Sequence, residues 1–89
     1  MKSKRTGQFY DLYAALPTAV QKQADKAYEQ FEVNPDHPGL NFKPVSGDPV
    51  WYSARISIKY RAVCFIDEDA YVWFWIGNHT EYEKLLNQR

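Results

Sequence analysis

The sequence predicts an α+β domain, in which an N-terminal helical hairpin and a short C-terminal helix pack on an antiparallel sheet of about four strands. Two observations lead to this prediction. Apolar residues recur with the period of a helix between residues 9 and 31, and they alternate with the period of a strand over much of residues 40–76. A chain of 89 residues makes one small domain, so we expect residues 1–89 to fold as a single unit.

Two helices are expected in the first third of the chain. The first has an apolar stripe and a plausible cap at Thr6; its stripe consists of Phe9, Leu12, Tyr13 and Leu16. Pro17 ends this helix and is suited to the first turn of the next one. The apolar stripe of the second helix consists of Val20, Ala24, Ala27, Tyr28 and Phe31. Asn34 ends it, because a residue that precedes proline avoids the helical conformation.

Four strands and a last helix are expected after residue 39. The predicted strands are 40–45, 50–58, 60–66 and 70–76, with turns at 46–49, near Lys59 and at 67–69. Such short connections favour an antiparallel meander. In the second strand, alternation places Ile56 and Ile58 on one face and Arg55 on the other. Thr80 and Glu83 fit a capping box that begins the last helix.

Composition sets limits on location and chemistry. Eleven Lys and Arg residues balance eleven Asp and Glu residues, which weakens the case for non-specific nucleic-acid binding. Cys64 is the only cysteine, so no intrachain disulfide can form, and we interpret it as a small buried hydrophobic residue. There is no signal-peptide pattern and no apolar run long enough to cross a bilayer. We therefore expect a cytoplasmic protein without membrane contact.

The candidate site residues are cations on the strands and a histidine at the end of the last one. Alternation allows Lys43, Arg55 and Arg61 to converge on one sheet surface, where fixed cations can hold a phosphate. The alternative is that each is an ordinary exposed strand charge. His79 follows a buried strand and can act as acid or base near neutral pH. Its alternative role is to cap the last helix or to bond a backbone group.

Several other kinds of site are not indicated. The two histidines, His37 and His79, are far apart in the sequence and have no cysteine nearby, so no metal signature is present. The sequence contains no Gly-rich phosphate loop, nucleophile elbow or dinucleotide fingerprint, and we expect no cofactor. Trp73 and Trp75 could stack on nucleobases. A role in the core is the commoner one for such residues.

Taken together, the segments of the chain resemble the RelE/ParE toxin superfamily. The segments that resemble it are Leu16–Gln21, Asn34–Val45, Tyr52–Ile56, Tyr60–Ala62 and Trp73–Tyr82. The resemblance implies helices packed on a small antiparallel sheet and a cognate antitoxin that wraps the toxin. Two features depart from the family pattern: the chain is neutral, whereas RelE-type nucleases are usually strongly basic, and the usual N-terminal edge strand looks missing or very short at Lys2–Gln8.

The two branches of this superfamily imply different functions. A RelE-like toxin would cut messenger RNA on the ribosome, with a 2′-hydroxyl attacking the adjacent phosphate. The resemblance then assigns Lys43, Arg55 and Arg61 as the cationic set, His79 as acid or base, and Tyr82 to stacking or proton handling. We favour this ribosome-dependent endoribonuclease. The alternative is a non-enzymatic ParE-like poison of DNA gyrase, or a degenerate toxin that only binds its antitoxin; neither needs a proton-transfer residue such as His79.

Overall fold

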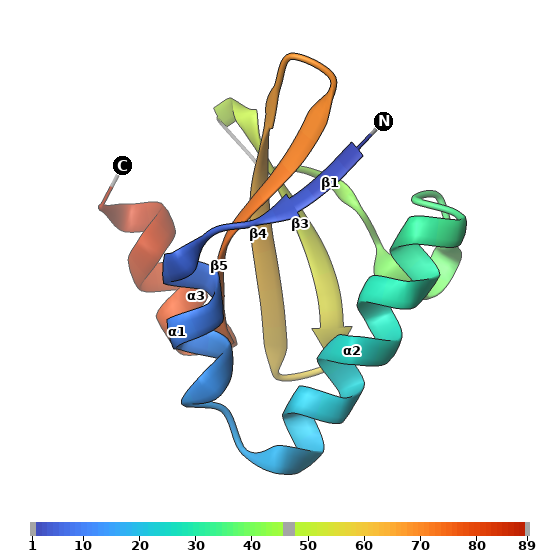
Figure 1. Ribbon diagram of the computed structural model, residues 1–89. Coiled ribbons are helices and arrows are strands. Elements are labelled where there is room, and N and C mark those ends of the chain that lie inside the picture. Colours follow the sequence, from blue (N-terminus) through green and yellow to red (C-terminus); the bar gives the residue numbers. More distant parts are fainter. Residues whose placement is uncertain (1, 46–47, 89) are drawn as a thin grey trace.

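A five-stranded sheet forms the centre of the computed structural model, which describes residues 2–45 and 48–88 (Figure 1). The strands follow one another across the sheet in the order β1-β5-β4-β3-β2. Their bounds are β1 Lys2–Arg5, β2 Lys43–Val45, β3 Asp48–Ser57, β4 Tyr60–Asp67 and β5 Ala70–Asn78. The helices are α1 Gly7–Ala14, α2 Thr18–Val33 and α3 His79–Asn87, with a 3₁₀ turn at Pro38–Leu40. The α+β fold is confirmed, but the sheet is mixed because β1 is parallel to β5.

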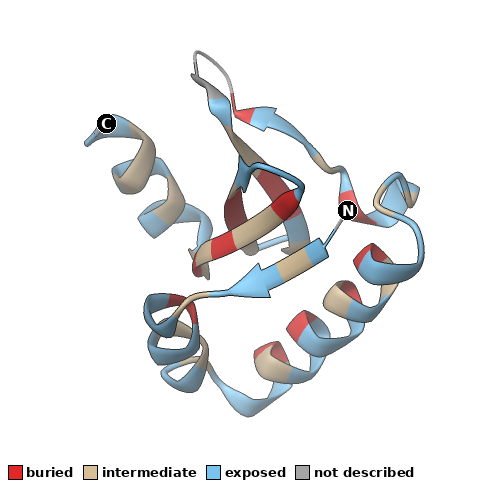
Figure 2. Cartoon of the chain, turned by 45° about the horizontal axis from the view of Figure 1, so that its top comes forward, coloured by how far each residue is buried: buried red, intermediate tan, exposed pale blue. Residues whose placement is uncertain are grey.

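The predicted helical hairpin is present. Thr6 caps α1, and its side-chain oxygen accepts the Phe9 N–H at 3.1 Å. Pro17 is the N-cap of α2 rather than a residue of its first turn, and Asn34 ends α2 as expected. Buried residues recur along the inner side of α2 (Figure 2).

The predicted strands are present with altered ends. Leu40 belongs to the 3₁₀ turn, and Asn41 takes a left-handed conformation with φ 46°, so β2 is shorter than predicted. The predicted turn at 46–49 includes Ser46 and Gly47, which lie outside the described residues, whereas the remaining two residues belong to β3. Ile58 was expected to face the core but is 73% exposed, because β3 ends one residue earlier and Ile58 lies in the turn.

The N-terminal edge strand, which looked missing or very short in the sequence, is present as the four-residue β1. Side chains from two other elements attach it: Tyr28 Oη and Trp73 Nε1 both donate to Ser3 Oγ, at 2.9 and 3.1 Å. The Arg5 guanidinium lies over the ring of Tyr28, 4.2 Å from its centroid. A short, charged segment has no alternation to mark it as a strand, so its pairing depends on these tertiary contacts.

The core lies between the two N-terminal helices and one face of the sheet. Phe31 of α2 is central to it and meets the rings of Tyr71 and Trp73 edge-on, with centroids 4.9 and 5.0 Å away. The other buried members are Phe9, Ala24, Ala27, Leu40, Ala54, Ala62, Cys64 and Ile76. Trp73 and Trp75 are both buried, as expected: Trp73 belongs to this core, whereas Trp75 packs against Tyr82 of α3 on the other face of the sheet. No helix of the described chain is long and apolar enough to cross a membrane.

Cys64 should be unreactive in the folded protein. Its side chain is 0% exposed, and burial raises the pKa of its thiol to about 12. Since the thiolate is the nucleophile, a disulfide reagent at pH 8 should modify the native protein only as fast as it unfolds, and should modify denatured protein at once. Spectrophotometric titration with and without denaturant measures this difference. Rapid stoichiometric labelling of the native protein would contradict the buried placement.

Candidate functional site

The two strand arginines form a pair on the sheet face that α1 and α2 leave open. Ala54 and Ala62 lie in the core beneath the helices, so the residues that precede or follow them in the strands project to the other side. Arg55 and Arg61 are direct partners across β3 and β4, and Arg61 is in turn opposite Gly77 of β5. The sequence therefore predicted the shared face of both arginines correctly.

Lys43 belongs to the same face through its partner in β3. It lies opposite Ser53, two residues before Arg55, so Lys43 and Arg55 are diagonal neighbours, typically about 7–8 Å apart. Leu40 lies in the 3₁₀ turn and not in the strand, so the placement of Lys43 rests on its pairing with Ser53. All three predicted cations thus lie on one surface. Arg55 and Arg61 form one cross-strand pair, and Lys43 belongs to the neighbouring pair on the same face.

This surface is suited to an anion. Like charges directly opposite each other on a sheet repel, as Arg55 and Arg61 must. The two ion pairs that the described residues make both lie on α3, so neither relieves this repulsion. A phosphate between the strands would compensate the positive charge and accept hydrogen bonds from the guanidinium groups.

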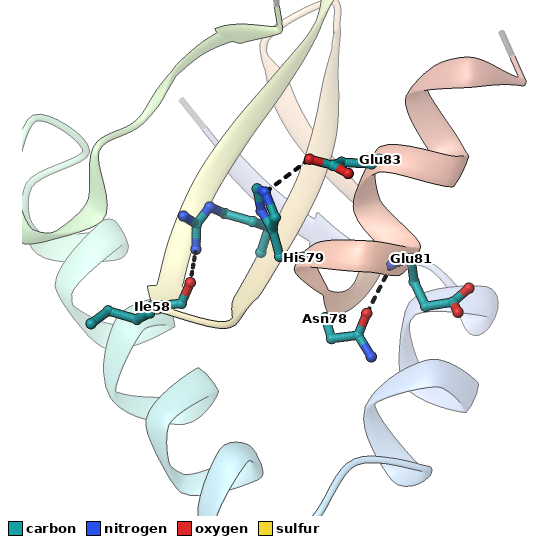
Figure 3. Close-up of polar contacts among 6 residues, drawn as sticks. Ile58, Asn78, His79, Glu81 and Glu83 are labelled. Carbon is teal, nitrogen blue, oxygen red and sulfur yellow. Dashed lines mark hydrogen bonds and ion pairs between the residues drawn. The ribbon is translucent and has the colours of Figure 1, made fainter.

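Arg61 also holds the turn between β3 and β4. Its Nη1 donates to the carbonyl oxygens of Ser57, Ile58 and Tyr60, at 2.6, 3.3 and 3.0 Å; the bond to Ile58 is drawn in Figure 3. These bonds use one of the three guanidinium nitrogens. Arg61 therefore has a structural role that the sequence did not reveal, and its remaining N–H groups are the ones suited to a ligand.

His79 is the first residue of α3, directly after β5. Asn78 is the N-cap, and its side-chain oxygen accepts the Glu81 N–H at 2.8 Å. The predicted capping box at Thr80 was therefore wrong by two residues, and β5 is followed directly by α3. The His79 N–H donates to the Lys59 carbonyl at 2.7 Å. The backbone of His79 is thus fixed to the β3–β4 turn, while its side chain is 52% exposed.

Glu83 contacts His79 and is a site residue that sequence reasoning missed. Its Oε1 lies 3.1 Å from His79 Nε2, one helical turn along α3 (Figure 3). The available signal was the i,i+4 spacing of the two residues, which places both on one side of a helix. Tyr82 is also beside the histidine, with ring centroids 6.1 Å apart. Two predicted site residues, His79 and Tyr82, are therefore neighbours on the first turn of α3.

Tyr82 packs against Trp75 of β5. The centroids of these two rings are 6.2 Å apart, and the Trp75 ring lies close over Gly77. A Cβ at residue 77 would come within 2.8 Å of that ring, so the close approach depends on glycine. The Trp75 ring, lying over Gly77, thereby forms the surface between the two arginines and α3.

An aromatic patch continues the open face away from the arginines. Phe74 contacts Trp51 and Phe65, with ring centroids 5.1 and 5.6 Å apart. A β-bulge leaves Phe74 without a partner in the β4–β5 register and lets it share the face of Phe65. Alternation does not predict this patch, because an extra residue in β5 interrupts it.

No metal centre was expected, and the described parts of the chain, 2–45 and 48–88, contain no group of three His, Cys, Asp or Glu residues able to hold a metal ion. This surface carries three strand cations, a histidine with a carboxylate partner, and aromatic rings on both sides of these groups. These groups can bind a phosphodiester, transfer a proton and stack on bases.

Comparisons with known proteins agree with this architecture. Residues 18–84 match the family model described as the ParE-like toxin domain. A YoeB/ParE toxin structure from Agrobacterium tumefaciens is similar at a TM-score of 0.69 and 18% identity, covering 89% of this chain and 99% of that chain. The RelB–RelE antitoxin–toxin complex from Methanococcus jannaschii matches at a TM-score of 0.69 and 14% identity, covering 91% and 95%. A search of curated proteins gave no match.

Escherichia coli YafQ has the same fold. Its structure matches at a TM-score of 0.64 and 13% identity, covering 91% of this chain and 96% of that chain. The matched chains are covered almost completely, so the likeness extends over the whole fold and not over one motif.

Proposed function

Because this chain belongs to the ParE-like toxin domain family and is the toxin of a toxin–antitoxin system, we propose that it is a ribosome-dependent endoribonuclease that cleaves messenger RNA. The observation that carries this proposal is the position of His79 beside the open sheet face on which Lys43, Arg55 and Arg61 lie. A toxin that only binds another protein needs no proton-transfer group next to a set of cations.

The proposed reaction uses the RNA as its own nucleophile. The 2′-hydroxyl oxygen attacks the adjacent phosphorus, the bond from phosphorus to the 5′-oxygen breaks, and the products are a 2′,3′-cyclic phosphate and a 5′-hydroxyl. His79 accepts the proton of the attacking hydroxyl or donates a proton to the leaving oxygen, and a water molecule carries out the other transfer. Arg55 and the unengaged N–H groups of Arg61 stabilise the negative charge that accumulates on the phosphoryl oxygens, with Lys43 as an outer contact.

Dependence on the ribosome follows from the openness of the site. His79 is half exposed, and the cations lie on a sheet surface, so the chain alone does not enclose the phosphate. Electrostatic stabilisation is much stronger where water is excluded. We propose that the ribosome closes the site around the message and that Tyr82 stacks on a base. Since the chain has no net charge, long-range attraction to the ribosome should be weak.

The expected regulator is a cognate antitoxin. The related toxin from Methanococcus jannaschii forms a complex with an antitoxin, and we propose the same kind of partner for this chain. An antitoxin that covered the open sheet face would neutralise the cations and shield the aromatic patch. It would block the site by occupying it, with no rearrangement of the sheet.

A second candidate function is a non-enzymatic one, either as a poison of DNA gyrase or as a toxin that only binds its antitoxin. Two observations favour it: the net charge is zero, and one nitrogen of Arg61 is committed to backbone carbonyls. In that case the cations would serve as contacts for a protein partner, and His79 would be dispensable.

Induced expression without the antitoxin should distinguish these functions in cells. We expect growth arrest in which amino-acid incorporation falls before thymidine incorporation, because translation is the proposed target. Purified protein should cut a ribosome-bound message and leave the same RNA intact in solution. An arrest in which replication stops first, with DNA breaks and an SOS response, would instead establish the gyrase function.

A further inference from the structure

We propose that Glu83 sets the protonation of His79: it keeps a proton on Nε2, so that Nδ1 is the nitrogen that exchanges a proton with the substrate. The second part of this proposal rests on the proposed function. Glu83 would act through the histidine and would not touch the RNA, which makes it a positioning residue. The family match does not indicate this role, and the i,i+4 spacing of the two residues indicates only that they share one side of α3.

The contact itself assigns the proton. An ionised carboxylate has acceptors only, so the 3.1 Å contact between Glu83 Oε1 and His79 Nε2 is favourable when that nitrogen carries a hydrogen. A neutral imidazole has a single N–H, which leaves the lone pair on Nδ1. When the ring is protonated, the proton that it can release without breaking the contact to Glu83 is again the one on Nδ1.

The charged residues near Glu83 have other partners, which leaves Glu83 paired with His79. The other carboxylate on the first turns of α3, Glu81, is paired with Lys84 at 3.5 Å. Arg61 donates from Nη1 to the turn carbonyls, and neither ion pair of the described residues joins it to Glu83. In the described part of the chain, His79 is thus the only basic side chain that contacts Glu83.

The junction fixes the backbone of both residues. The Asn78 cap and the bond from His79 N–H to the Lys59 carbonyl fix the start of α3, and Glu83 follows one turn later on the same helix. The ring of Tyr82 lies near the imidazole, with centroids 6.1 Å apart. Rotation of the histidine about its own side-chain bonds is therefore the freedom that remains, and the contact to Glu83 restricts it (Figure 3).

The pair should contribute little to folding. Both side chains are more than half exposed, at 52% and 63%, and exposed pairs of this kind add little to stability. Replacement of Glu83 should therefore leave the folded structure intact and change only the state of His79. Partners that orient metal-bound histidines typically affect metal affinity or activity by about 10–100-fold, and we expect an effect at the low end of that range here.

Nitrogen-15 NMR of histidine-labelled protein tests the assignment directly, because the chain has two histidines. His37 is an internal reference: its Nδ1 accepts the Gly39 N–H at 3.0 Å, so it is also protonated on Nε2 but is held by a different group. At a pH where the ring is neutral, wild-type His79 should show a single Nε2–H form. Glu83→Ala should give a mixture of both tautomers at His79 and leave His37 unchanged.

Glu81→Ala is the matched control, since Glu81 is an exposed glutamate on the same helix with a different partner. It should leave the His79 spectrum and RNA cleavage unchanged, whereas Glu83→Ala should lower kcat about 10-fold with KM unchanged. An unaltered His79 tautomer in Glu83→Ala would overturn the proposal. If wild-type protein shows no cleavage on ribosomes, the proposed function fails, and the NMR result still decides whether Glu83 sets the protonation of His79.

Discussion

His79→Ala should lower cleavage of ribosome-bound messenger RNA by about 10²–10⁴-fold, the usual contribution of a general acid or base. The side chain is half exposed, and the contacts that hold α3 to the β3–β4 turn are made by its backbone. Melting temperature and antitoxin binding should therefore be close to wild type. The measurement is single-turnover cleavage of a defined message on purified ribosomes.

His37→Ala is the matched control for this experiment. His37 is the other histidine of the chain and caps the 3₁₀ turn through the Gly39 N–H, in a segment with no proposed role in the reaction. It should show full activity with a stability loss of about 1 kcal/mol, typical of a removed cap. Full activity in His79→Ala would exclude an acid or base role for that residue.

Arg61→Ala should lose both activity and stability, and Arg55→Ala activity alone. Removing one group that stabilises transition-state charge typically costs about 10²–10³ in rate, and we expect this of both variants. Arg61 also donates to three backbone carbonyls of the β3–β4 turn, so its loss should lower the free energy of unfolding by about 1–3 kcal/mol. Arg55 is exposed, and its removal relieves the repulsion with Arg61.

Chemical denaturation and the cleavage assay on the two variants separate these effects. Combining Arg61→Ala with His79→Ala should reduce activity less than the product of the single losses, because groups that act on one transition state are not additive. Equal stability of the two arginine variants would contradict the structural role of Arg61. Full activity in Arg55→Ala would remove the phosphate contact from the proposed mechanism.

Local sequence determined the elements and much of the candidate surface. The apolar stripe of α2, the cap at Thr6 and the stop at Asn34 depend on neighbours within a few residues, so periodicity and capping rules predict them. Alternation likewise assigned Arg55 and Arg61 to the face opposite Ala54 and Ala62, since a strand inverts its side chains at every residue. His79 was placed correctly after the last buried strand, because the apolar run that predicts this strand is itself a local feature of the sequence.

The tertiary structure decided what depends on residues far apart in the chain. The pairing of β1 with β5, the bulge that turns Phe74 to the open face and the bonds from Arg61 to the turn have no local signal, because their partners are brought together only when the sheet forms. The N-cap of α3 at Asn78 in place of Thr80 is of the same kind, since the backbone bond from His79 to Lys59 fixes where the helix begins. The chemistry of His79 thus follows from its sequence position, but its orientation toward Glu83 follows from that junction.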